Sequence, residues 1–101
     1  MRELEEIYEM VVKSTIDVSG LPFESISVSR EERCVTARVV IVSTLLGMGM
    51  TEGDIVRLSG MSQQRVNALK NSARYRLNGL CAKVMARAVM ERVKEMGGLL
   101  T

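Results

Sequence analysis

The side chains best suited to recognising another molecule are amides and guanidinium groups that recur between residues 63 and 74. Gln and Asn can form paired hydrogen bonds with adenine, and Arg can do the same with guanine. We predict that five residues of this segment approach base edges in the major groove of double-stranded DNA: Gln64, Arg65, Asn67, Ala68 and Asn71. The alternative is a polar helix surface with no recognition role.

A second set of side chains could hold phosphates without reading a base sequence. Basic groups do so by charge, and hydroxyl groups at helix N-termini do so by hydrogen bonds. The predicted phosphate-contacting residues are Arg30, Arg33, Arg38, Thr51, Ser62, Lys70 and Arg74.

The distribution of charge supports this second set. The formal net charge is +2, but residues 1–32 hold three basic and eight acidic side chains, whereas the rest holds eleven basic and four acidic ones. No acidic residue occurs between Ile55 and Met90. A long stretch of one sign favours a phosphate partner. The alternative is a solvated helical face whose counter-charges come from the acidic N-terminal third.

Two short helices joined by a tight turn would position these side chains. The first is predicted over residues 52–59, because Thr51 can cap it and Asp54 stands at the reciprocal position of a capping box. Gly60 can adopt the positive φ that ends such a helix. The turn follows directly.

The second helix is predicted over residues 63–77, with Ser62 as its N-cap. Apolar residues recur in it at spacings of three and four and so form one inward stripe: Val66, Leu69, Ala73 and Leu77. The candidate base-contacting residues lie on or beside the opposite face. The two helices together have the pattern of a helix-turn-helix.

The rest of the chain is also predicted to be helical. Apolar periodicity predicts a first helix over about residues 2–13, one helical turn over residues 21–26, and a polar loop over residues 27–33. A mostly buried helix is expected from about residue 36 to residue 47. The fold class is therefore all-α, a helix-turn-helix bundle of about five to six helices.

An amphipathic helix is predicted beyond Asn78 and Gly79. We expect residues 1–78 to form the helix-turn-helix domain and residues 79–101 to form a C-terminal dimerisation or packing element. The residues expected to form its apolar stripe are Leu80, Val84, Val89, Val93 and Met96. Pairing of this stripe between two copies would give a homodimer. The alternative is that the helix packs against the first helix of its own chain.

The residue inventory argues against an enzyme. The chain has no His, no Gly-rich phosphate loop and no nucleophile elbow, so we expect no catalytic residues, metal, cofactor or small-molecule ligand. Cys34 and Cys81 are isolated thiols, and no signal peptide or apolar run long enough to cross a membrane is present. These features predict a soluble cytoplasmic protein.

The order of these elements resembles the C-terminal DNA-binding domain of the bacterial replication initiator DnaA, within the Trp-repressor-like group of helix-turn-helix folds. The resemblance covers roughly residues 4–77. It implies that the basic loop before the long helix, which corresponds here to Arg30, Arg33 and Arg38, touches the minor groove and backbone. The position most like the family's groove-inserting arginine is Glu31. Ser62, Gln63, Gln64 and Arg65 replace the family's Asp-His-Thr-Thr signature.

Together these features predict sequence-specific binding of double-stranded DNA, in a small transcriptional regulator or a DnaA-like DNA-binding protein. The alternative is a protein–protein interaction module that uses the same helical fold and the Met-rich terminal helix and has no specific DNA site.

Overall fold

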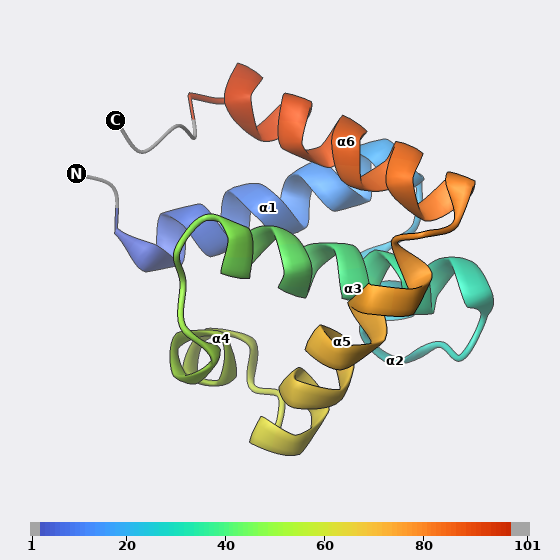
Figure 1. Cartoon of the computed structure of the whole chain (residues 1–101). Coiled ribbons are helices and arrows are strands. Elements are labelled where there is room, and N and C mark those ends of the chain that lie inside the picture. The colour runs from blue at the N-terminus through green and yellow to red at the C-terminus, as the bar shows by residue number, and fades with distance from the viewer. Residues whose placement is uncertain (1–2, 98–101) are drawn as a thin grey trace.

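The computed structural model describes residues 3–97, and in this part of the chain it contains six α-helices and no strand (Figure 1). The prediction of an all-α bundle of five to six helices is confirmed. The helices are α1 (Leu4–Ser19), α2 (Phe23–Val28), α3 (Glu32–Gly47), α4 (Glu52–Ser59), α5 (Gln63–Arg76) and α6 (Leu80–Glu95).

Helix α3 is the centre of the bundle and contacts all five other helices. Its β-branched run would suit a strand by propensity, but the run is buried on several faces, and tertiary packing overrides that preference. The fully buried apolar residues of α3 are Ala37, Val39, Val40, Val42 and Leu45. Because α3 contacts every other helix, the other helices are positioned relative to it.

Helix α6 packs along α1 and α3 of its own chain (Figure 1). Val89 and Val93 lie in the core, exposed by 0% and 1%, so these two residues of the predicted stripe are not available to a second copy, and the alternative that this helix packs on its own chain is the one observed. The reason is that α1 has an apolar face of its own, which α6 covers. Ser14 of α1 donates a hydrogen bond to the Met96 sulfur at 3.3 Å, which fixes the far end of this contact. Residues 79–95 therefore share one core with the preceding helices.

Several helix boundaries differ from the sequence-based expectation. Helix α1 continues six residues beyond Lys13, to Ser19, and is capped by Gly20, which has a φ of 72°. The expected polar loop over residues 27–33 shrinks to three residues, because α2 extends to Val28 and α3 begins at Glu32. The long helix thus starts about four residues earlier than predicted.

The unit formed by α4 and α5, called here the α4–α5 unit, follows its local sequence signals closely. Both hydrogen bonds of the capping box between Thr51 and Asp54 are present. Gly60 ends α4 with a φ of 78°, and the Ser62 hydroxyl accepts a hydrogen bond from the Arg65 N–H at 3.1 Å. Helix α4 has the predicted bounds, and α5 ends one residue earlier than predicted.

Candidate nucleic-acid interface

Helix α5 is anchored by its inner side and leaves the opposite side open. Val66 and Leu69 are buried, and α5 contacts α3 and α4. Because a helix turns about 100° per residue, residues two or five positions from the buried ones face away from the core. The polar residues of the first three turns therefore form an outward surface.

One flank of α5 is held by α4. The Glu52 carboxylate accepts a hydrogen bond from Gln63 Nε2 at 3.0 Å and from Lys70 Nζ at 2.8 Å. These two contacts join the first and second turns of α5 to the first turn of α4. Lys70, a predicted phosphate contact, is therefore already ion-paired within the protein.

The other flank of α5 is held by α2 and α3. Arg65 Nη2 donates a hydrogen bond to the backbone oxygen of Ser27 at 2.7 Å, and Arg76 forms an ion pair with Glu32. The Arg65 side chain thus lies against the end of α2 and is separated from the other predicted base-contacting residues. Helical periodicity predicts that Arg65 lies on a flank of α5, but it does not predict the hydrogen bond to Ser27.

The outer face of α5 contains the other four predicted base-contacting residues. All four are exposed: Gln64, Asn67, Ala68 and Asn71. Asn71 Nδ2 donates a hydrogen bond to Asn67 Oδ1 at 3.3 Å, so these two amides lie together. The structure brings this part of the predicted site onto one surface.

Two further residues extend this surface toward the end of α5. Arg74 is exposed and its side chain has no hydrogen bond or ion pair with the residues that the structure describes. Tyr75 is 79% exposed and was not predicted to be part of the site. The signal that could have identified Tyr75 is the same helical periodicity, since position 75 follows Asn71 by four residues. We call the set Gln64, Asn67, Ala68, Asn71, Arg74 and Tyr75 the outer face of α5.

The predicted phosphate-contacting arginines before α5 are only partly available. Arg33 Nη2 donates to the Ser19 oxygen at 3.2 Å, and Arg38 Nη1 donates to the Ile26 oxygen at 2.7 Å. Carbonyl groups at helix C-termini carry partial negative charge, so these arginines stabilise the ends of α1 and α2. The Arg30 side chain is exposed and has no hydrogen bond or ion pair with residues 3–97.

Burial distinguishes Arg38 from the other arginines. Desolvation lowers the pKa of its guanidinium group below the usual value, and the positive charges of Arg65 and Arg76 lower it further. The group remains a cation at neutral pH because the pKa of an arginine side chain ordinarily lies far above neutrality. A half-buried arginine that is bonded to a backbone carbonyl suits a structural role better than a phosphate contact.

The two predicted hydroxyl contacts, Thr51 and Ser62, are exposed N-caps. Each hydroxyl accepts a backbone hydrogen bond inside the α4–α5 unit, from Asp54 and Arg65 respectively. Both remain able to donate their own proton to a phosphate oxygen.

Comparison of this chain with models of protein families, with curated proteins and with solved structures gives no match. No helix among the described residues has the length and apolar character needed to cross a membrane. Within the same residues, no three acidic or thiol side chains gather closely enough to hold a metal ion.

Proposed function

We propose that the α4–α5 unit is a helix-turn-helix that binds double-stranded DNA, with the outer face of α5 in the major groove. The observation that supports this proposal most is that this face is exposed and rich in amides, while both flanks of α5 are held by other helices. An orientation fixed in this way limits the entropy lost when the face meets a rigid partner.

The dimensions of α5 suit this task. Fourteen residues give a helix about 21 Å long, and the major groove of B-DNA is about 12 Å wide and admits one α-helix. Gln64, Asn67 and Asn71 follow one another by three and four residues and so point to the same side. Their amides could pair with adenine edges.

The surrounding charges support binding to phosphate. Arg74 and Arg30 are unpaired cations within the described part of the chain, and Arg65 and Lys70 lie on opposite flanks of α5. In this proposal Arg65 contacts backbone phosphate and not a base, because its guanidinium group lies against α2. Arg33 and Arg38 mainly hold the fold together.

The order of helices resembles the DNA-binding domain of DnaA, which supports a role as a small cytoplasmic regulator of transcription or a DnaA-like DNA-binding protein. An interaction module without a DNA site is the alternative. The two functions predict different behaviour with salt, because binding driven by phosphate contacts weakens steeply as the salt concentration rises.

Selection of bound sequences from a random duplex pool tests the proposal. We expect enrichment of one short motif by the wild-type chain and loss of that enrichment in the Asn67→Ala, Asn71→Ala double variant. Both residues are exposed, so the variant should keep the wild-type helix content. If no motif is enriched and no salt-dependent binding to any duplex is seen, DNA binding is rejected in favour of the interaction module.

A further inference from the structure

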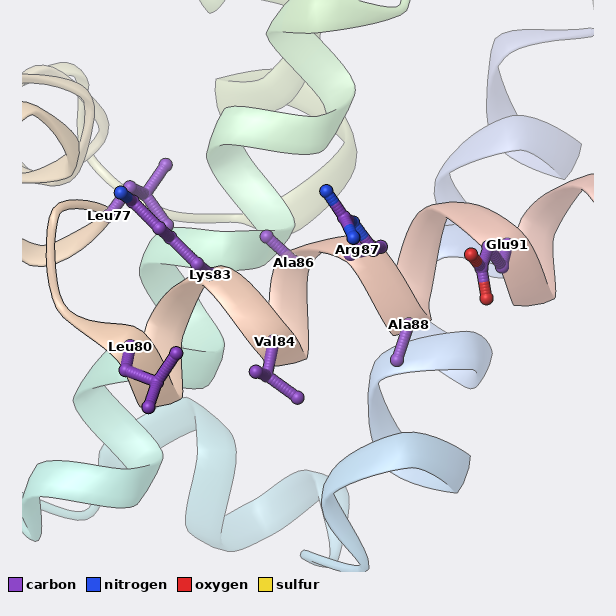
Figure 2. A pocket seen from close by; sticks show the side chains of 8 residues that line it. All are labelled: Leu77, Leu80, Lys83, Val84, Ala86, Arg87, Ala88 and Glu91. Atoms are coloured by element: carbon purple, nitrogen blue, oxygen red, sulfur yellow. The ribbon is translucent and has the colours of Figure 1, made fainter.

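Two cavities lie outside the outer face of α5, and they are built differently. One is a groove of about 580 Å³, and Figure 2 shows that all its lining side chains except Leu77 come from α6. The other, of about 210 Å³, is lined by residues of α1, α2, α3 and the α4–α5 unit. Ligand sites of helical proteins are typically formed between helices, so the smaller cavity is the stronger candidate for a binding site. We call it the α2 cavity, because α2 supplies four of its lining residues.

Apolar side chains form one part of the α2 cavity. Phe23 is 47% exposed and Val28 is 74% exposed. Both line the cavity together with Ile26, Ile41 and Met61. Large apolar side chains that stand together on a surface mark a contact site more often than isolated ones do. This part of the cavity therefore suits the apolar body of a ligand.

Two guanidinium groups give the α2 cavity a positive charge. Arg38 donates to the Ile26 oxygen and Arg65 to the Ser27 oxygen, both at 2.7 Å, so consecutive carbonyl groups at the end of α2 hold the two arginines near each other. Burial lowers the pKa of Arg38, and the positive charge of Arg65 lowers it further. A guanidinium group has five N–H donors, and neither arginine has another hydrogen bond or an ion pair with residues 3–97. Both therefore keep donors for a ligand.

The other polar groups of the α2 cavity favour a negatively charged ligand without an amine. No Asp or Glu of the described residues lines the cavity, so an anion meets no like charge there and an ammonium group would have no counter-charge. Tyr8 also lines it, and the Tyr8 hydroxyl has no hydrogen bond with residues 3–97. Burial raises the pKa of this hydroxyl, which keeps it a neutral donor. A carboxylate accepts hydrogen bonds from hydroxyl and guanidinium groups alike.

We infer that the α2 cavity binds a small apolar monocarboxylate, an aromatic or branched-chain acid without an amino group. The carboxylate accepts hydrogen bonds from Arg38 and Arg65, and the apolar body packs against Phe23. The cavity is smaller than the roughly 300–1,000 Å³ of sites for drug-sized ligands, which limits the ligand to a small molecule. The negative charge also relieves the repulsion between the two neighbouring arginines.

The sequence predicts no small-molecule ligand, because the residues that line the α2 cavity are distributed over separate helices. By sequence, Arg38 and Arg65 are candidates for contact with DNA. The bonds to the end of α2 bring them to one cavity instead. Binding of the carboxylate does not depend on DNA binding, so it can be tested on the protein alone.

Titration of the isotope-labelled full chain with benzoate, followed by NMR, tests the inference. We expect saturable chemical-shift changes at amides that border the cavity, such as those of Ser27 and Gly60, with a Kd of about 1 mM for so small a ligand. Benzyl alcohol has the same ring without the charge, so it should bind about tenfold more weakly. Absence of saturable changes at these amides, or equal binding of benzyl alcohol, overturns the inference.

Inorganic phosphate distinguishes a carboxylate site from a contact to the DNA backbone. Phosphate has the charge but no apolar body, so it should bind more weakly than benzoate at the same amides. Tighter binding of phosphate than of benzoate would make the two arginines a phosphate contact and would overturn the inference.

Two variants with matched controls test the two parts of the α2 cavity. Arg65→Gln should raise the Kd for benzoate about tenfold, whereas Arg87→Gln, at an exposed position of α6 outside the cavity, should not change it. Phe23→Ala should raise the Kd about threefold, and Leu4→Ala, at a position that is 37% exposed on α1, is its control. Circular dichroism checks that each variant keeps its helix content. An equal effect of Arg65→Gln and Arg87→Gln, or no effect of Phe23→Ala, overturns the inference.

Discussion

Lys70 Nζ lies 2.8 Å from Oε2 of Glu52, and this contact joins the middle of α5 to the first turn of α4. Glu52 is well placed for this purpose, since a carboxylate at a helix N-terminus is also stabilised by the helix dipole. For the DNA binding proposed above, the pair would have two opposing effects. It fixes the orientation of α5, and it neutralises a cation that would otherwise face phosphate.

Glu52→Gln separates these two effects. The pair is exposed, so its loss should lower the free energy of unfolding by no more than about 1 kcal/mol. Lys70 becomes free, and we expect tighter binding to duplex DNA with a steeper dependence on salt. Fluorescence anisotropy with labelled duplex DNA across a salt series measures both the affinity and its dependence on salt. Glu9→Gln on α1 removes the same charge away from α5 and is the control. Weaker binding by Glu52→Gln would mean that orientation matters more than charge.

Arg74→Ala should weaken binding to all DNA sequences alike. Arg74 has no carboxylate partner within the described residues, so its charge is available to phosphate. Losing one phosphate contact should lower the slope of log affinity against log salt by about one. Lys13→Ala removes an equal charge from an exposed position of α1 and should leave the slope unchanged. A loss confined to one DNA sequence would contradict the phosphate role.

Asn71→Ala should change sequence preference more than overall affinity. An amide that pairs with an adenine edge contributes about 1–3 kcal/mol of discrimination at that base pair. Competition between the selected motif and its single-base variants measures this preference. Ser72→Ala, beside Asn71 but turned toward the flank of α5, is the control. An unchanged preference in Asn71→Ala would remove this amide from base recognition.

The capping box makes stability depend on pH. The Thr51 hydroxyl and backbone N–H lower the pKa of the Asp54 carboxyl below its usual 3.8. A lowered pKa in the folded state means that the carboxylate stabilises the fold above the usual pKa, and that this stabilisation is lost as the pH falls through the folded value. The difference in melting temperature between wild type and Asp54→Asn should therefore shrink below about pH 4. A melting-temperature difference that stays constant down to pH 2.5 would contradict this prediction.

Local signals in the sequence explain why α4 was predicted with its observed bounds. Thr51, Asp54, Gly60 and Ser62 lie within twelve positions and each acts on its immediate neighbours. Helix α1 was predicted too short for the opposite reason. Its last turns contain polar residues, yet Thr15 is buried because its hydroxyl donates to the Val11 oxygen at 2.8 Å. A polar side chain satisfied in this way gives no hydrophobic signal.

Helical periodicity predicts which residues of the candidate site face outward, but it does not predict their contacts with other helices. Periodicity identified the outward position of Gln64, Asn67 and Asn71. It could not show that Arg65 bonds to Ser27 or that Lys70 pairs with Glu52, because these partners are 38 and 18 positions away in sequence. Contacts of this kind depend on how the helices pack, and they decide which cations remain free.

The division of α6 into a buried face and an exposed face can be measured by comparing two valines. Val89 is 0% exposed and Val84 is 59% exposed, so truncation to alanine removes the same atoms from very different surroundings. Val89→Ala should lower the free energy of unfolding by roughly 2–3 kcal/mol, from lost burial and the cavity that remains. Val84→Ala should change it by about 0.5 kcal/mol or less. Urea unfolding followed by circular dichroism measures both, at a protein concentration low enough for the chain to be monomeric. Equal losses in the two variants would show that α6 does not pack on α1 and α3 through Val89.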